Sequence, residues 1–209
     1  LDVGTGEISE LLSDVNGVKL AWSGDKLVIL IRELTPDDPN LNAWENKLLI
    51  LNLSQLPIET TTIAGDWIMP ATESGDESYV TVSSDGQWIL FVDTQMQGLV
   101  RMDGKIIEPP DRPSYMMHPQ WIGNTNQVSY SVGDGVGLSP SAQAYRFDPE
   151  TGFARLLMER PAIFVQVSGD NQYAAVTDPA LKRLSLDTNR LFTLSEDRAA
   201  YPLWSPDSN

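Results

Sequence analysis

The sequence predicts an all-β protein, and three observations support this prediction. Apolar or alternating runs recur at the length of β-strands, whereas helical periodicity is scarce. Clusters of Gly, Pro, Asn and Asp separate these runs at short intervals, as turns between strands do. A short motif also recurs along the chain at intervals of 37 to 60 residues. The strand-length runs are 26–31, 47–53, 79–82, 88–92, 127–132, 144–147, 162–167 and 173–176.

The recurring motif is a polar turn that follows one predicted strand and, in all but the last copy, precedes another. The 182 residues between the first and the last copy make four intervals of 45.5 residues on average. A period of about 40–50 residues is that of a propeller blade. The copies are Trp22-Ser23-Gly24-Asp25, Val82-Ser83-Ser84-Asp85-Gly86, Trp121-Ile122-Gly123-Asn124, Val167-Ser168-Gly169-Asp170 and Trp204-Ser205-Pro206-Asp207.

A second set of turns runs in phase with the first. These turns begin with Asp and contain Gly or Asn, which accept a positive φ, and they lie at 2–6, 103–104, 148–152 and 187–189. Each repeat therefore contains an inner strand, the Ser-x-Asp turn, a second and a third strand, the Asp turn and a fourth strand. Four antiparallel strands per unit, repeated radially, predict a β-propeller. The alternative is a sandwich in which the repeat is a coincidence.

The repeat divides the chain into about four blades within one propeller domain that spans residues 1–209. We expect partial blades at both ends, and therefore a segment of a longer chain. Insertions at 35–46 and 134–141 and a longer passage at 66–76 interrupt the pattern. The expected boundaries are 17–65, 77–110, 116–159 and 161–196 for the full blades, and 1–13 and 199–209 for the partial ones.

The motif Trp204-Ser205-Pro206-Asp207 resembles the repeat of TolB-like and WD40-like propellers, whose turn commonly reads Trp-Ser-Pro-Asp-Gly. The same repeat occurs in the propeller domains of prolyl-oligopeptidase and dipeptidyl-peptidase families. The resemblance covers nearly the whole chain, although one copy alone carries the proline. It implies that the Trp or Val packs between blades and that the Asp caps the turn. It specifies a fold unit, not an activity.

Composition limits the partners and the chemistry. The 209 residues include 14 basic and 29 acidic side chains, which gives a net charge of −15. Nucleic acids and anionic lipid surfaces select for clustered Lys and Arg, so neither is an expected partner. The chain has no cysteine, which excludes disulfides, thiolate metal sites and a cysteine nucleophile. We expect no membrane helix and an extracytoplasmic bacterial protein, periplasmic or at the cell surface, with the cytoplasm left open.

No residue pattern predicts catalysis, a cofactor or a metal. His118 is the single histidine, and no Gly-x-Ser-x-Gly elbow accompanies it, so a structural or channel-facing role is expected. The glycine-rich run 133–137 is followed by neither a helix nor a lysine, and we interpret it as a loop. Two oxygen-rich groups lack calcium-loop spacing and are interpreted as solvated loops. They are Asp37, Asp38 and Asn40, and Glu73, Asp76 and Glu77.

Trp44, Trp67 and Met69 lie in or beside the insertions, not in the repeat motif. Apolar side chains on loops are typical interface anchors, so these three are the candidate partner contacts; capping their own blades is the alternative. We therefore expect a non-catalytic module that binds a basic or neutral protein partner, as a scaffold. The rival hypothesis is a substrate-gating propeller of a prolyl-oligopeptidase-type hydrolase whose catalytic domain lies outside this segment. A small-molecule or calcium sensor is a third alternative.

Overall fold

The computed structural model contains sixteen β-strands, and no helix occurs among the residues that it describes. Those residues are 16–34, 44–54, 57–63, 79–92, 97–107, 116–132, 143–158, 162, 164–178, 180–198, 202 and 204–205. The strands form four antiparallel sheets of four strands each, so the predicted all-β class is confirmed. In every sheet, strands that are consecutive in the chain pair with one another.

The first two sheets are formed by residues 16–107. The first sheet contains β1 (Asn16–Ser23), β2 (Lys26–Leu34), β3 (Trp44–Asn52) and β4 (Glu59–Ile63). The second sheet contains β5 (Tyr79–Val82), β6 (Trp88–Val92), β7 (Gln97–Arg101) and β8 (Ile106–Ile107).

The last two sheets repeat this plan. The third sheet contains β9 (Met116–Trp121), β10 (Val128–Val132), β11 (Gln143–Asp148) and β12 (Phe153–Met158). The fourth sheet contains β13 (Phe164–Val167), β14 (Tyr173–Asp178), β15 (Ala180–Ser185) and β16 (Leu191–Arg198).

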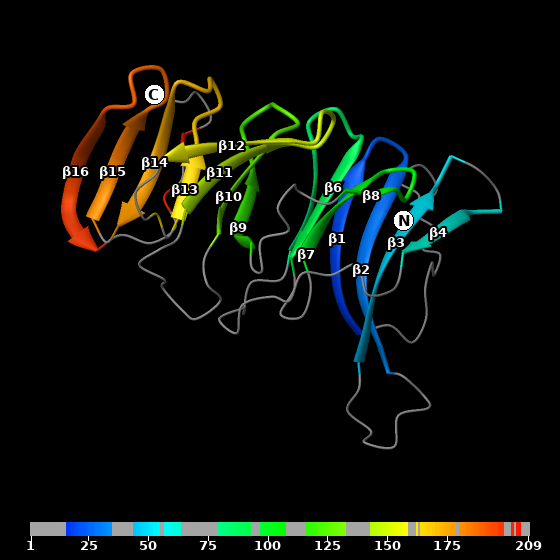
Figure 1. Ribbon diagram of the computed structural model, residues 1–209. Coiled ribbons are helices and arrows are strands. Elements are labelled where there is room, and N and C mark those ends of the chain that lie inside the picture. Colours follow the sequence, from blue (N-terminus) through cyan, green and yellow to red (C-terminus); the bar gives the residue numbers. More distant parts are fainter. Residues whose placement is uncertain are drawn as a thin grey trace.

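The four sheets lie side by side in chain order, from the blue first sheet to the orange fourth sheet (Figure 1). The first strand of each later sheet packs against the sheet before it: β5 against β1, β9 against β6, and β13 against β10. The first and second strands of the sheets therefore approach the neighbouring sheet most closely. Strands such as β6 are buried on both faces, which explains why the sequence shows unbroken apolar runs.

An apolar layer fills each interface between neighbouring sheets. Ile89 and Phe91 of β6 face the first sheet, whereas Leu90 of the same strand faces the third. Alternate residues of one strand thus belong to two different layers, as the pleat requires. The layer between the third and fourth sheets contains Ile122, Ala144, Met158, Ala162, Val165, Val167, Ala174, Val176 and Leu184.

The Ser-x-Asp turns are held by the same hydrogen bonds in the second and fourth sheets. The Ser168 hydroxyl donates to Asp170 Oδ1 at 2.6 Å and accepts from the Tyr173 amide at 3.0 Å. Asp170 Oδ1 also accepts from the Gln172 amide at 3.0 Å. Ser83, Asp85, Gln87 and Trp88 form the equivalent bonds. The aspartate therefore caps the turn, as the resemblance implied.

The tryptophans of the motif behave differently from one another. Trp204 lies on the fourth sheet, where its indole N–H donates to the Gln166 carbonyl at 2.8 Å. Trp121 packs with the layer between the second and third sheets. The expectation that Trp22 packs between blades is wrong for the described residues, because its side chain is 61% exposed. Trp22 pairs with Leu27 on the face of the first sheet that points away from the second, so no described sheet covers it.

Candidate functional site

Of the three residues predicted as partner contacts, only Trp44 lies within the described residues. Trp44 is the first residue of β3, where it pairs with Leu34 across the β2–β3 hairpin. Trp67 and Met69 lie outside the described residues. Residues 35–43 of the predicted 35–46 insertion also lie outside them. So do the insertion at 134–141, the passage at 66–76, the glycine-rich run 133–137 and both oxygen-rich groups. Their predicted roles remain predictions.

His118 lies on β9 and adopts a left-handed backbone conformation with φ of 49°. The pairing between β9 and β10 shifts register beside it, so the residue forms part of a bulge. Its ring lies 4.2 Å from the ring of Phe164, the first residue of β13. Burial lowers its pKa to about 4, so the imidazole is neutral at pH 7. Among the described residues, no group of three or more metal-ligating side chains occurs near it or elsewhere.

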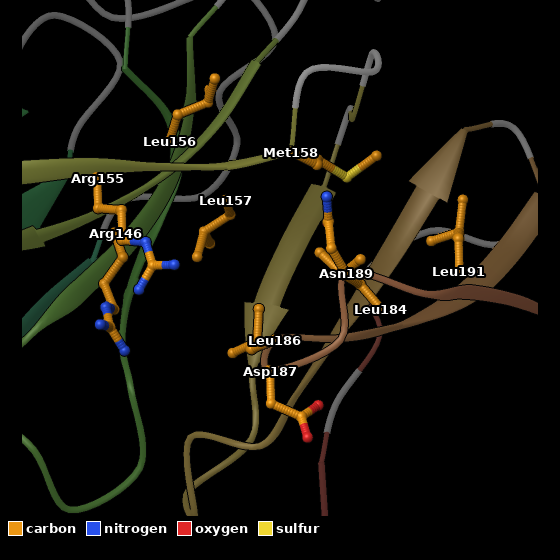
Figure 2. A pocket seen from close by; sticks show the side chains of 10 residues that line it. All are labelled: Arg146, Arg155, Leu156, Leu157, Met158, Leu184, Leu186, Asp187, Asn189 and Leu191. Carbon is orange, nitrogen blue, oxygen red and sulfur yellow. The ribbon is translucent and has the colours of Figure 1, made fainter.

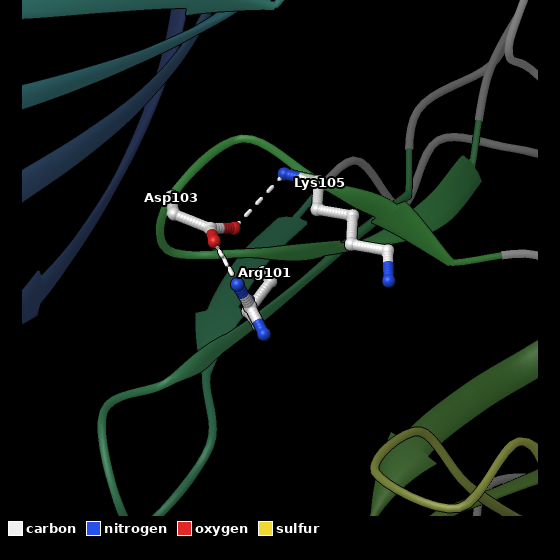
Figure 3. A network of polar contacts seen from close by, with 3 residues as sticks. All are labelled: Arg101, Asp103 and Lys105. Atoms are coloured by element: carbon white, nitrogen blue, oxygen red, sulfur yellow. Dashed lines mark hydrogen bonds and ion pairs between the residues drawn. The ribbon is translucent and has the colours of Figure 1, made fainter.

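A polar network closes the β7–β8 hairpin (Figure 3). The Arg101 guanidinium donates to Asp103 Oδ2, and the Lys105 amide donates to Asp103 Oδ1 at 3.1 Å. The hydrogen bond from Arg101 is the main reason why the pKa of Asp103 falls to about 2. The network connects neighbouring residues of a single turn, and it is a structural cap.

A cleft of about 680 Å³ opens between the outer strands of the third and fourth sheets. We call it the outer cleft. One wall comes from β11 and β12, and the facing wall comes from the end of β15, the following turn and the start of β16 (Figure 2). The residues that line it are Arg146, Arg155, Leu156, Leu157, Met158, Leu184, Leu186, Asp187, Asn189 and Leu191.

The strand register explains the composition of the first wall. Arg146 of β11 pairs directly with Arg155 of β12, so both side chains lie on the same face of the hairpin. The register between these strands shifts at Ala144 and Tyr145, which leaves Leu157 as an extra residue on β12. This bulge lets the consecutive residues Leu157 and Met158 both line the outer cleft, although a regular strand would alternate them.

The turn between β15 and β16 shapes the second wall. Asp187 Oδ1 accepts hydrogen bonds from the Ser185 hydroxyl and from the Thr188 amide, the latter at 2.7 Å. The Ser185 hydroxyl is the main cause of a lowered pKa at Asp187, which keeps this carboxylate ionised. Leu184 is 2% exposed and lies at the bottom of this wall, and Leu186 and Leu191 stand beside it.

The comparisons with known proteins come from structure alone. No protein-family model and no curated protein sequence matches this chain. The β-propeller domain of the Trilobed protease from Pyrococcus furiosus is similar, with a TM-score of 0.53 and 12% identity over 87% of this chain and 57% of that one. This chain folds as a β-propeller.

Two further solved structures are similar to this chain in fold. Oligogalacturonate lyase from Vibrio parahaemolyticus matches with a TM-score of 0.61 and 14% identity, over 95% of this chain and 58% of the lyase. A eukaryotic initiation factor matches with a TM-score of 0.64 and 12% identity, over 98% of this chain and 50% of the factor. The propeller described here therefore spans between half and three fifths of the length of these structures.

The two arginines of the propeller's outer cleft have little compensation for their charge. The Arg146 guanidinium donates to the neutral side-chain oxygen of Asn171, in the β13–β14 turn, at 3.3 Å. Arg155 forms no hydrogen bond or ion pair with any residue of the described segments. Like charges directly opposite one another on a sheet are destabilising. The wall thus carries two positive charges at close range without a bound carboxylate among the described residues.

Sequence reasoning missed the outer cleft, although one signal pointed to it. Arg146 and Arg155 lie on the two sides of the predicted hairpin turn at 148–152, which predicts that they come from neighbouring strands. Their direct pairing depends on the register, in which Asp148 pairs with Phe153. Their position opposite the leucines at 184–191 could not be predicted, because it depends on how the third and fourth sheets pack. No spacing within the sequence states that packing.

Proposed function

We propose that this propeller is a non-catalytic module that binds a protein partner, with the outer cleft as a binding site. The outer cleft carries the proposal because it combines apolar walls with unpaired positive charge. Interface centres are typically apolar pockets with a few charged anchors, and arginine is among the residues enriched there. The sheets on both sides have continuous buried layers, so partner binding requires no refolding of the walls.

Several features of the sequence agree with this function. The net charge of −15 favours a basic or neutral partner surface over most of the molecule, and it disfavours nucleic acid. Trp44, Trp67 and Met69 are proposed as further contacts. We propose a TolB-like or WD40-like repeat type and an extracytoplasmic location, for which the repeat motif and the absence of cysteine are the support. Within the described residues, no helix is long and apolar enough to cross a membrane.

Capture experiments with two matched leucine variants test this function. Purified chain is coupled to beads, incubated with extract of the source organism, and bound proteins are quantified by mass spectrometry. Leu186→Asp places a charge on the apolar wall of the outer cleft. Leu194→Asp makes the same change at a residue that is 57% exposed and does not line the outer cleft.

We expect one protein to be retained by the wild type and by Leu194→Asp and lost with Leu186→Asp, while circular dichroism of all three remains the same. Equal retention by both variants would exclude the outer cleft as the binding site. No retention above an equally acidic control protein would exclude the protein-binding function.

A gating propeller attached to a hydrolase is the second candidate. The acylaminoacyl peptidase from Pyrococcus horikoshii is similar to this chain with a TM-score of 0.52 and 12% identity, and the match covers 33% of that peptidase. The proposal would change if the full-length gene encoded an adjoining α/β-hydrolase module with its own Ser, Asp and His.

A further inference from the structure

The outer cleft contains a feature that general protein binding does not explain, namely the directly opposed pair Arg146 and Arg155. Two guanidiniums paired across a hairpin repel each other, and an anion that lies between or beside them relieves this repulsion. The described residues supply Asn171 to one and nothing to the other. Asp187 lines the outer cleft too, but its bonded partners are its own neighbours Ser185 and Thr188. A ligand can therefore bring the negative charge that this arginine pair lacks.

The chemistry of that ligand follows from the arginines. Guanidinium groups present a planar fork of N–H donors that matches the two oxygens of a carboxylate. The leucines beside the arginines, Leu157, Leu184, Leu186 and Leu191, carry no charge, and their surface suits an aliphatic side chain. A ligand that fits both has a carboxylate and an apolar group separated by a few ångströms.

The strand order leaves one edge of the outer cleft open for pairing. β12 is the outermost strand of the third sheet, so one of its two edges has no strand partner among the described residues. An edge of this kind presents backbone N–H and C=O groups to which an extended peptide can pair. Arg155 and Leu157 are two residues apart on this strand, and both line the outer cleft. An added strand would place side chains that are two residues apart against them.

We propose that the outer cleft binds an extended peptide segment that pairs with the edge of β12 and carries an acidic residue two positions from an aliphatic one. The acidic side chain lies against Arg155 and Arg146. The aliphatic side chain enters the space between Leu157 and the leucines of the facing wall. This inference rests on the proposed protein-binding function and specifies the segment that the partner presents. It also explains how an acidic protein can recognise an acidic group, since the opposed arginines make the outer cleft locally positive.

Fluorescence anisotropy with defined peptides tests the proposal. The probes are fluorescein-labelled seven-residue peptides of Thr and Val that contain Glu-Thr-Leu or Leu-Thr-Glu at the centre. Both orders are used because an edge strand accepts parallel and antiparallel partners. The matched peptides replace Glu by Gln or by Lys, or Leu by Ala. N-acetylglutamate amide serves as a carboxylate without a strand.

The protein variants are Arg155→Glu and, as a matched control, Arg190→Glu. Arg190 lies in the β15–β16 turn, is exposed and does not line the outer cleft, so this variant makes the same change of charge close by. We expect a Glu peptide to bind the wild type about tenfold more tightly than its Gln counterpart, as charge-assisted hydrogen bonds to arginine predict. Arg155→Glu should abolish this preference and favour the Lys peptide, while Arg190→Glu should leave the order unchanged.

Equal binding of the Glu and Gln peptides, or an equal effect of both variants, would overturn the acidic specificity. Binding of N-acetylglutamate amide as tightly as the peptide would also overturn it, in favour of a small carboxylate. The variant Arg155→Gln is a second test in case Arg155→Glu fails to fold, because it removes the charge without reversing it. It should lose the preference for Glu without gaining one for Lys. If the partner that this chain retains through Leu186 contains no such segment, this inference is overturned and the proposed function stands.

Discussion

Gly123, in the turn between β9 and β10, lies directly against Gly169, in the turn between β13 and β14. A Cβ atom on Gly123 would come closer than 3.0 Å to the backbone Cα of Gly169. Gly123 also has a φ of +48°, a conformation that glycine adopts readily. Gly123 and Gly169 occupy the same middle position in the third and fourth copies of the motif. A side chain at Gly123 has no room, because the two turns meet at backbone distance.

Gly123→Ala should destabilise the protein more than Gly24→Ala. Both glycines have positive φ, but a Cβ on Gly24 would meet nothing within 4 Å. The backbone strain is therefore common to both variants, at about 1–2 kcal/mol. Crowding against Gly169 adds roughly 1–3 kcal/mol for Gly123→Ala. Urea unfolding measures the difference, and equal losses would contradict the close packing of the third and fourth sheets.

His118 should titrate far below an ordinary histidine. Burial lowers its pKa to about 4, whereas the unfolded chain has a value near 6.5. The unfolded state therefore binds the proton first as the pH falls, and stability declines between pH 6.5 and 4. NMR titration should show a midpoint near 4. His118→Asn, which tolerates positive φ, should remove this part of the pH dependence of the melting temperature. A midpoint near 6.5 would show that the ring is solvated.

Asp103 should titrate at a pKa of about 2 because Arg101 donates to it. The folded pKa lies below the ordinary value of 3.8, so the contribution to stability is complete above pH 3.8 and disappears as the pH falls towards 2. Carbon-detected NMR of the carboxyl group measures the midpoint. Arg101→Gln should return the midpoint towards 3.8. No change in this variant would mean that the hairpin backbone, not the guanidinium, holds the carboxylate.

Trp44 and Trp67 should contribute to partner capture if the insertions contact the partner. The double variant Trp44→Ala with Trp67→Ala is compared with Trp22→Ala, which removes an exposed tryptophan of the first sheet. We expect at least a several-fold loss of retained partner in the double variant alone, with an unchanged circular dichroism spectrum. Undiminished capture would assign these tryptophans to their own blades.

The sequence predicted the architecture well because the repeat records local interactions. The Ser168–Asp170 and Ser83–Asp85 turns are closed by bonds within five residues, and such turns mark the boundary between two strands wherever they occur. In the third sheet Thr125 replaces the aspartate as the acceptor of the turn, since its hydroxyl accepts from the Gln127 amide at 3.1 Å. The repeat survives there even though the aspartate is missing.

The outer cleft could not be predicted in the same way. Arg146 and Leu186 are separated by 40 residues and come from different sheets. Their approach depends on the apolar layer between those sheets and on the bulge at Leu157, neither of which has a local motif. The exposed Trp22 shows the same limit, because a motif residue packs between sheets only where a neighbouring sheet covers it.

Hydrogen–deuterium exchange of the complex with the Glu-containing peptide tests the central claim most directly. At saturation, the amides on the free edge of β12 (Phe153–Met158) should exchange more slowly than in the free protein, because they donate to the added strand. The amides of β4 (Glu59–Ile63), the outermost strand of the first sheet, serve as the internal control and should not change. Slower exchange in β12 and unchanged exchange in β4 is the predicted result. Unchanged exchange in β12, or equal protection of both strands, would contradict binding in the outer cleft.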